Sequence, residues 1–154
     1  MIFWFTGQPG SGKTTLAREL ISHFKNTDSN IKIVNIDGDD LRSMNKNKDY
    51  SKKGRIKNIS TAISIMRFLC NKKYICIVSI VAPYRFLRDE LKDEFSFLEI
   101  YLHTKEIRGR EKFFAKDYEI PVDPNTLFLD TGESNIEECI DEVLNVYRKM
   151  ATLA

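Results

Sequence analysis

A glycine-rich segment near the start of the chain has the composition of a phosphate-binding loop. It reads GQPGSGKTT, follows the apolar run at residues 1–6, and matches the spacing GxxxxGK[ST]. Its glycines let successive backbone N–H groups turn toward phosphate oxygens. Lys13 would place a positive charge near the β and γ phosphates, and Thr14 would offer a hydroxyl to Mg²⁺. The segment therefore predicts a site for a nucleoside triphosphate with Mg²⁺, formed by Gly7, Pro9, Gly10, Ser11, Gly12, Lys13, Thr14 and Thr15.

A second cluster, DGDDLR at residues 37–42, combines three carboxylates with an arginine. Crowded carboxylates are unfavourable unless a cation or a ligand balances them. In a phosphoryl-transfer site one carboxylate can hold Mg²⁺ through water, another can accept the proton of an attacking hydroxyl, and an arginine can bind a phosphate. The alternative is helix N-capping, which accounts for one aspartate, Asp39 or Asp40, but not for the cluster. Because the run Tyr74–Val81 ends in no aspartate, Asp37 is the nearest acid that could support the metal.

Alternating short apolar runs and amphipathic segments must position these residues, and the alternation predicts βαβ units. Since several runs are apolar on both faces, we expect a three-layer α/β/α sandwich around a mostly parallel sheet of five strands. The polar motifs then lie along the rim where the strands end. The expected strands cover Ile2–Thr6, Ile31–Ile36, Tyr74–Val81, Phe97–Leu102 and Thr126–Leu129. The expected helices cover Lys13–Phe24, about Ser51–Cys70, Pro83–Phe95, a segment that begins near Lys105, and Ile136–Met150.

The chain length fits a single domain, residues 1–154, and the balance of charges narrows its partners. With 24 basic and 22 acidic residues the formal net charge is +2, which argues against a broad nucleic-acid footprint. The basic run from Lys46 to Lys57 is either a solvated helix face or a site that attracts an anionic substrate. Three cysteines without metal-type spacing indicate a reducing cytoplasm, and no apolar run is long enough to predict a membrane partner.

Four segments occur in the order and approximate spacing seen in adenylylsulfate kinases, and the chain resembles that family over most of its length. They are GQPGSGKTT, DGDDLR, YSKKGRIKNIS from Tyr50 to Ser60, and IVAPYRFLRDE from Ile80 to Glu90. The resemblance implies a P-loop kinase-like fold and, usually, a homodimer. It also implies transfer of the γ-phosphoryl group of ATP, with Mg²⁺, to the ribose 3′-hydroxyl of a small-molecule nucleotide that carries a 5′ mixed anhydride.

The resemblance further implies roles for individual residues. Lys13, Asp37 and Asp39 would be catalytic, with Asp37 linked to the metal and Asp39 acting as the base. Arg108 or Arg110 is similar to the family's arginine near the base of ATP. The acceptor nucleotide would be bound by Asp39, Arg42, Tyr50, Arg55, Asn58, Pro83, Tyr84 and Arg85.

The chain departs from the family pattern around the acceptor. Asn58 is followed by Ile59–Thr61 in place of a second basic pair, and Ala82 stands where the family has serine. The segment Arg108–Pro121 lacks the long lid that, in the family, supplies a second aromatic face over the adenine, opposite the position of Tyr50. A pocket with half a purine clamp should accept a different base or hold the same base weakly. We therefore expect the short branch of the family that phosphorylates cytidine diphosphoramidate in capsular phosphoramidate synthesis, with adenylylsulfate as the alternative acceptor.

Two other classes of protein share parts of this pattern. A 5′-hydroxyl polynucleotide kinase also joins a GxPGSGKT loop to an aspartate and arginine cluster, but the near-neutral charge speaks against a strand-binding groove. A nucleotide-gated switch without chemistry of its own would need an NKxD-type motif and a switch aspartate that closes a strand, and the sequence has neither. A kinase of a small molecule is the interpretation that the sequence favours.

Overall fold

Five parallel strands form the central sheet of the structure, a computed structural model that describes residues 1–153. Their order across the sheet is β2-β3-β1-β4-β5, and each neighbouring pair is parallel. The central strand β1 is buried along its whole length, as expected for a strand covered on both faces. The strands are β1 (Ile2–Thr6), β2 (Ile33–Asp37), β3 (Ile75–Ser79), β4 (Phe97–His103) and β5 (Leu127–Asp130).

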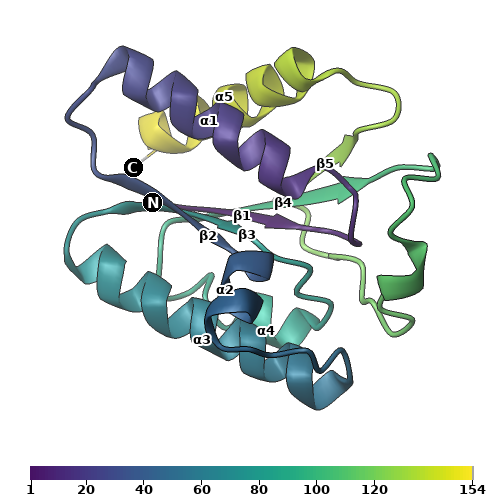
Figure 1. Ribbon diagram of the computed structural model, residues 1–154. Coiled ribbons are helices and arrows are strands. Elements are labelled where there is room, and N and C mark those ends of the chain that lie inside the picture. Colours follow the sequence, from purple (N-terminus) through teal and green to yellow (C-terminus); the bar gives the residue numbers. More distant parts are fainter. Residues whose placement is uncertain (154) are drawn as a thin grey trace.

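Helices cover both faces of this sheet (Figure 1). They are α1 (Lys13–Thr27), α2 (Gly38–Met44), α3 (Lys52–Asn71), α4 (Arg85–Asp89) and α5 (Ile136–Leu153). The helices α1 and α5 lie on one face, and α2, α3 and α4 lie on the other. Because strand side chains alternate, Phe3 and Phe5 pack toward α1 and α5, whereas Ile2 and Trp4 pack toward α3 and α4. The predicted three-layer α/β/α sandwich is confirmed. Within residues 1–153, none of these helices combines the length and the apolar character needed to cross a membrane.

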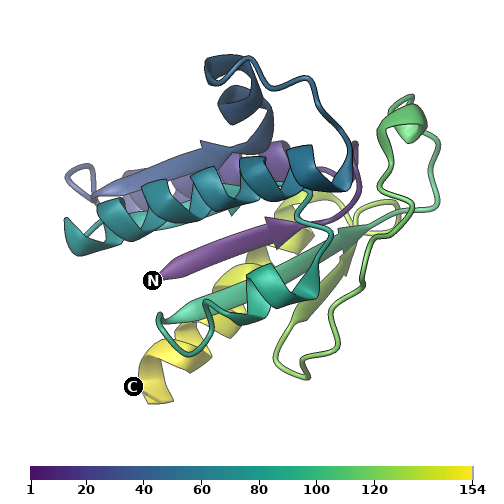
Figure 2. The same cartoon turned by 90° about the horizontal axis from the view of Figure 1, so that it is seen from below.

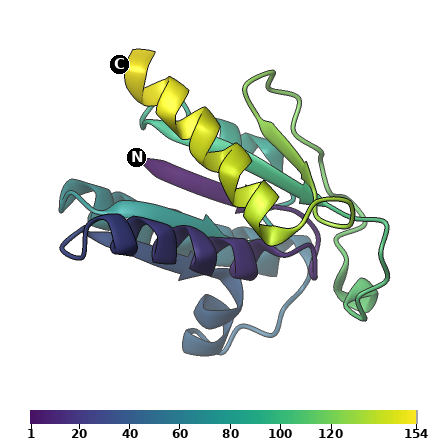
Figure 3. The same ribbon diagram turned by 90° about the horizontal axis from the view of Figure 1, so that it is seen from above.

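The carboxyl ends of the strands meet at one rim of the sheet, as the sequence predicted. All strands point the same way, so the segments that follow β1, β2 and β3 leave the sheet on the same side (Figure 2). The register pairs Asp37, the last residue of β2, with Ser79, the last residue of β3. Residues 104–126, here called the lid segment, project beyond the rim and return at β5 (Figures 2 and 3). The rim therefore brings together segments that are far apart in the sequence.

The predicted strands differ from the structure only at their ends, but the predicted helix over Pro83–Phe95 is wrong in length. Helix α4 ends at Asp89, and the chain continues as turns in which backbone N–H groups donate to carbonyls three or four residues earlier. These turns keep Leu91 fully buried while the ammonium of Lys92 reaches the carboxylate of Glu99. Tertiary contacts of two neighbouring side chains thus end the helix early.

Two further segments differ in kind from the prediction. Residues Gly38–Met44 form helix α2, which the sequence pattern did not predict as an element. Only Gly38 and Leu41 in it are buried, so it has almost no apolar periodicity. The helix expected near Lys105 is absent, because Gly109 has a φ of 78°, which a right-handed helix excludes. A 3₁₀ turn at Glu111–Phe113 takes its place.

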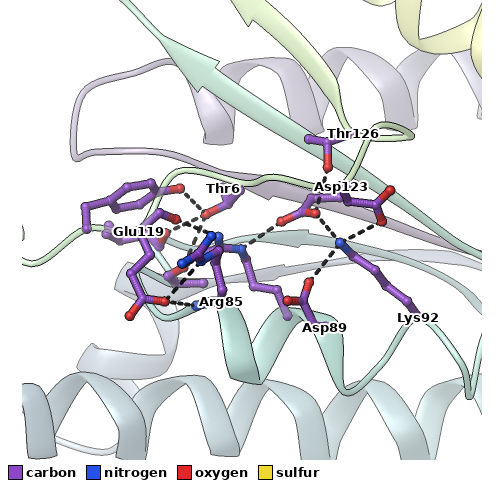
Figure 4. A network of polar contacts seen from close by, with 12 residues as sticks. Thr6, Arg85, Asp89, Lys92, Glu119, Asp123 and Thr126 are labelled. Atoms are coloured by element: carbon purple, nitrogen blue, oxygen red, sulfur yellow. Dashed lines mark hydrogen bonds and ion pairs between the residues drawn. The ribbon is translucent and has the colours of Figure 1, made fainter.

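A buried ion-pair network joins α4, β4 and the lid segment (Figure 4). Arg88 Nε donates to Glu99 Oε1 at 2.7 Å, and both side chains are almost completely buried. The guanidinium of Arg88 also donates to the carbonyls of Ala82, in the loop after β3, and of Glu119, in the lid segment. Lys92 Nζ binds the second oxygen of the Glu99 carboxylate at 2.7 Å. Since buried charges need partners, this network holds the root of the lid segment against the sheet.

We predict that Glu99→Leu lowers the free energy of unfolding by about 3–5 kcal/mol, because Arg88 is left as a buried charge without its carboxylate. The double variant Glu99→Leu/Arg88→Met removes both charges and should regain part of that loss. Urea unfolding followed by circular dichroism measures both variants. A double variant that is less stable than the single one by a further 2 kcal/mol or so would contradict the assigned pairing.

Candidate active site

A cavity of about 390 Å³ opens at the rim between the phosphate loop, α2, α3 and the lid segment. Most of the residues predicted for the donor and acceptor sites line it, although they come from separate segments of the chain. The predicted residues that line the cavity are Pro9, Gly10, Gly12, Lys13, Thr14, Thr15, Asp37, Asp39, Arg42, Tyr50, Arg55, Asn58, Pro83, Arg108 and Arg110.

The phosphate loop has the backbone that its glycines permit. The φ angles of Gly7, Gly10 and Gly12 are 149°, 83° and 103°, in the region that favours glycine. A Cβ atom on Gly7 would also collide with the carbonyl oxygen of Leu102 in β4. Gly7 and the buried Ser11 do not line the cavity, so their contribution is to shape the loop. The loop then leads into α1 at Lys13, with its N-terminal amides at the cavity.

Lys13 is buried at the start of α1, and the loop holds its ammonium group. Nζ donates to the carbonyl of Gly7 at 3.0 Å and to that of Gln8 at 2.8 Å. Burial lowers the pKa of Lys13 to about 7, and the negative charges of Asp39 and Asp37 oppose this shift. A triphosphate beside the ammonium would add negative charge and favour its protonated form. The environment of Lys13 therefore suits an anionic ligand.

The carboxylate of Asp37 lies where the phosphate loop, β3 and α2 meet. Its Oδ2 accepts hydrogen bonds from Thr14 Oγ1 at 2.6 Å and from Ser79 Oγ at 2.9 Å. Its Oδ1 accepts from the backbone N–H groups of Asp39 and Asp40 at 2.9 and 3.3 Å. Asp37 is thus the N-cap of α2, and the prediction that Asp39 or Asp40 is the capping residue is wrong. Asp39, which does not cap the helix, lines the cavity, whereas Asp40 is exposed and does not line it.

Ser79 is a cavity residue that the sequence analysis missed. It ends β3 opposite Asp37, is 3% exposed, and lines the cavity. Its hydroxyl bonds to Asn35 Oδ1 as well as to Asp37. In the sequence, the only sign of this role is that Ser79 lies near the carboxyl end of an apolar run, where an aspartate is usual in such sites. The register between β2 and β3 places Ser79 beside Asp37 at the cavity.

Thr14 and Asp37 together offer the donor atoms that a magnesium ion requires. Their side-chain oxygens lie 2.6 Å apart at the cavity. Mg²⁺ binds oxygen ligands in octahedral geometry and usually takes one or two carboxylates, substrate phosphates and several waters. A hydroxyl and a carboxylate at the base of a phosphate loop fit that donor set. The residues present therefore suit the ion that the sequence predicted.

Two arginines flank the ring of Tyr50 on the acceptor side of the cavity. The guanidinium carbons of Arg42 and Arg55 lie 4.1 and 5.7 Å from the ring centroid. Arg42 donates to the carbonyl of Asp49 at 2.8 Å, and Arg55 donates to that of Phe113 at 2.8 Å. Within residues 1–153 neither has a carboxylate within 4.0 Å. Two neighbouring positive charges that form no ion pair favour binding of an anion.

Asn58, in α3, presents an unused acceptor to the same cavity. Its side chain is 3% exposed, and Nδ2 donates to the carbonyl of Gly38 at 3.1 Å. In the described part of the chain its Oδ1 has no hydrogen-bond partner. A buried acceptor without a partner costs about 1–3 kcal/mol, which a hydroxyl or amino group of a ligand would offset. This geometry supports contact between Asn58 and a bound nucleotide.

Phe113, on the 3₁₀ turn of the lid segment, supplies a second aromatic ring beside Tyr50. The ring centroids are 5.2 Å apart, with an angle of 35° between the ring planes. The prediction that this chain lacks a second aromatic face is therefore wrong. A base stacked between two rings needs a separation of about 7–8 Å, or two carbon contact distances. The two rings must therefore move apart before a base can enter between Tyr50 and Phe113.

The two lid arginines reach the phosphate side of the cavity. Arg108 Nη1 donates to the carbonyl of Gly10 at 3.1 Å. Arg110 forms an ion pair with Asp39, with Nη2 3.7 Å from Oδ2. Both side chains therefore lie over the loop that would hold a triphosphate, and the expected contact of one of them with the base of ATP stays a prediction.

Tyr84 and Arg85, by contrast, lie outside the cavity. Tyr84 is 2% exposed and packs in the core beneath α3 and α4. Arg85 begins α4 and faces the lid segment, where its Nε lies 3.6 Å from Glu119 Oε2 (Figure 4). Of the predicted wall at residues 83–85, only Pro83 contributes, together with Val81 and Ala82. Tyr84 instead lines a neighbouring hollow together with Tyr50, Arg55 and Phe113, and the acceptor roles of Tyr84 and Arg85 stay predictions.

Several known proteins with similar sequences or folds are kinases. Residues 1–125 match the profile of the adenylylsulphate kinase family. The adenylyl-sulfate kinases of Staphylococcus carnosus and Prochlorococcus marinus are 28% and 31% identical to this chain, over 94% of it and 82% of each relative. A mutant of the APS kinase CysC of Mycobacterium tuberculosis has 25% identity and a TM-score of 0.72, with 96% of each chain covered.

Other solved structures bear on the fold and on assembly. A complex of the same mycobacterial enzyme with AMPPNP and APS has 23% identity and a TM-score of 0.77, and so supports the fold. An APS kinase of Thiobacillus denitrificans, 26% identical, is described as hexameric, and this chain covers 29% of it. The homodimer that we expected from the sequence stays a prediction.

These matches agree with the cavity at the rim, which joins a phosphate loop to a region that holds Arg42 and Arg55. Members of the matching family use ATP and Mg²⁺ to phosphorylate an alcohol group. The chain belongs to the adenylylsulphate kinase family and is an ATP-dependent nucleotide kinase of that type.

Proposed function

We propose that this chain transfers the γ-phosphoryl group of ATP to the ribose 3′-hydroxyl of a nucleotide with a 5′ mixed anhydride, and that the acceptor is adenylylsulfate. One observation carries the proposal: the phosphate loop shares its cavity with two arginines, Arg42 and Arg55, that form no ion pair within the described chain. The donor phosphates occupy the first region, and an anionic acceptor occupies the second. The names of the curated relatives support adenylylsulfate as that acceptor.

On the donor side, the loop amides and Lys13 bind the β and γ phosphates. Thr14 and Asp37 hold Mg²⁺, which supplies positive charge to the triphosphate. Arg108 and Arg110 cover the loop from the lid segment. These groups orient the γ phosphate and stabilise the charge that it carries in the transition state.

On the acceptor side, Arg42 and Arg55 bind the 5′ anhydride, and Asn58 Oδ1 accepts a hydrogen bond from the nucleotide. Pro83 forms part of the wall, and Tyr50 stacks on the base. Asp39, which lines the cavity beside the phosphate loop, accepts the proton of the 3′-hydroxyl. The bond from O3′ to the γ phosphorus forms as the bond from phosphorus to ADP breaks, so no covalent enzyme intermediate is needed.

Cytidine diphosphoramidate is the second candidate acceptor, and the short chain favours it. The alignments with the two curated relatives span 166 and 168 positions, more than the 154 residues available here, so at least 12 positions are gaps in this chain. The contact between Tyr50 and Phe113 also leaves a tight space for a base. Cytosine has a smaller stacking surface than adenine, and phosphoramidate shares the tetrahedral shape of sulfate.

A direct substrate comparison tests the proposal. Incubation with Mg-ATP and either adenylylsulfate or cytidine diphosphoramidate should yield, for the true acceptor, a product heavier by one phosphoryl group in mass spectrometry. We expect turnover of adenylylsulfate. Turnover of the cytidine compound alone would replace the acceptor and keep the mechanism, whereas turnover of neither compound would contradict the proposal.

Two substitutions should separate chemistry from acceptor binding. Asp39→Asn removes the proposed base and should lower kcat by about 10²–10⁴-fold while the KM for ATP changes little. Arg55→Ala should raise the KM of the acceptor by at least tenfold, because its charge-assisted contacts to the anion are lost. Steady-state kinetics with each substrate varied in turn measures both effects. Near-normal turnover by Asp39→Asn would refute the base assignment.

Asp37 offers a matched pair of variants, because it caps α2 and is also the proposed metal-linked carboxylate. Asp37→Asn keeps an oxygen for the N–H groups of Asp39 and Asp40, so its unfolding free energy should stay close to that of the wild type. Its Mg-ATP turnover should fall by at least 100-fold, since the negative charge is lost. Asp37→Ala should lose turnover and, in addition, about 1 kcal/mol of stability. Urea unfolding and a turnover assay on both proteins give the comparison, and an active Asp37→Asn would exclude the metal role.

A further inference from the structure

Gln8 joins the phosphate loop to the lid segment, and the mechanism above does not use it. Its Nε2 donates to the carbonyl of Ala115 at 2.8 Å, and the N–H of Ala115 donates to its Oε1 at 2.9 Å. Both backbone groups of Ala115 are thus bound by a single side chain, as in a pair of neighbouring strands. Ala115 is 3% exposed, so water competes little for these bonds. The contact fixes both the distance and the orientation of the lid segment relative to the loop.

The lid segment is bound to the phosphate loop at a second point. Arg108 Nη1 donates to the carbonyl of Gly10 at 3.1 Å, and Nη2 donates to that of Thr131 at 2.8 Å. Thr131 Oγ1 in turn donates to the carbonyl of Ser11 at 2.7 Å. The stretch of chain at residues 108–115 is therefore anchored to the loop at both ends.

Phe113 lies between these two anchors, two residues before Ala115. Its ring contacts Tyr50, and its carbonyl accepts from Arg55 Nη2 at 2.8 Å. Two proposed acceptor residues, Tyr50 and Arg55, therefore contact a segment whose position is set by the phosphate loop. Phe113 therefore keeps its place over the acceptor site through contacts that include the two bonds between Gln8 and Ala115.

We propose that Gln8 is a positioning residue that couples binding of the donor nucleotide to the placement of the aromatic lid over the acceptor. A nucleotide in the phosphate loop holds Gln8 in the orientation that binds Ala115, and this keeps Phe113 over the acceptor site. By linkage, an acceptor held under the lid tightens donor binding by the same factor. The identity of the acceptor rests on the proposed function, but the link between loop and lid does not.

Three variants separate this role from a general effect on the fold. Gln8→Leu has a similar size and loses both hydrogen bonds to Ala115. Ala115→Pro keeps Gln8 and removes only the N–H donor, and the preceding Phe114, with φ −58° and ψ 137°, already has a conformation that proline allows. Lys105→Gln, at an exposed position of the lid segment, serves as the control. Thermal unfolding establishes that each variant is folded.

The first measurement is the dissociation constant of adenylylsulfate with and without saturating MgADP, by calorimetry. We expect MgADP to tighten binding to the wild type and to Lys105→Gln. This tightening should shrink by about five- to tenfold in Gln8→Leu, which lacks two hydrogen bonds, and by a smaller factor in Ala115→Pro. In turnover assays the KM of the acceptor should rise by a similar factor, whereas kcat should change less than the KM does. Unchanged coupling in Gln8→Leu would overturn the proposal.

The second measurement needs no acceptor. Hydrogen–deuterium exchange of peptides that contain Ala115 should slow when MgADP is added to the wild type and should respond much less in Gln8→Leu. An equal response in both proteins, or no response in the wild type, would also overturn the proposal. If adenylylsulfate does not bind to the wild type, the acceptor assignment fails, while the exchange experiment still decides the role of Gln8.

Discussion

The carboxylate of Asp37 is the contact on which the geometry of the candidate site depends. A carboxylate that is 6% exposed needs hydrogen-bond donors, and it takes them from three elements at once. Thr14 comes from the start of α1, Ser79 ends β3, and the N–H of Asp39 begins α2. These bonds fix the phosphate loop relative to the neighbouring strand and to the helix that carries Asp39 and Arg42. The candidate metal position and the candidate base are therefore set by the same group.

Charges in this protein fall into two groups that differ in how they are balanced. Arg88 and Glu99 are fully buried, and each is paired and hydrogen-bonded, so they hold α4, β4 and the lid segment together (Figure 4). Arg42 and Arg55 at the cavity have only carbonyl partners within the described chain. Paired charges contribute to the fold, whereas charges without a counter-ion remain available to a ligand. The acceptor side of the cavity can therefore be recognised from this difference in charge pairing alone.

The lid segment is the part of the chain whose contacts limit access to the space beside Tyr50. It contains no regular helix, and it is held by side chains at its root and by the phosphate loop near Arg108 and Ala115. Between these anchors, Phe113 closes against Tyr50. Such a segment has few buried apolar contacts of its own, so it belongs to the less stable parts of the structure, from which moving elements are drawn. An acceptor base that enters this space must replace the contact between Tyr50 and Phe113.

The sequence by itself determined the phosphate loop, the alternation of strands and helices, and the rim along which the polar motifs meet. These features depend on local spacing: glycines with positive φ at Gly10 and Gly12, and apolar runs that need cover on both faces. It did not determine α2, which has almost no apolar periodicity, nor the early end of α4, beyond which Lys92 reaches Glu99. Only the tertiary structure decided that Ser79 and Phe113 belong to the cavity and that Tyr84 and Arg85 do not. Which residues line the cavity depends on strand register and on the direction of each side chain. These are fixed by contacts between residues that lie 30 to 60 positions apart, so no local pattern in the sequence encodes them.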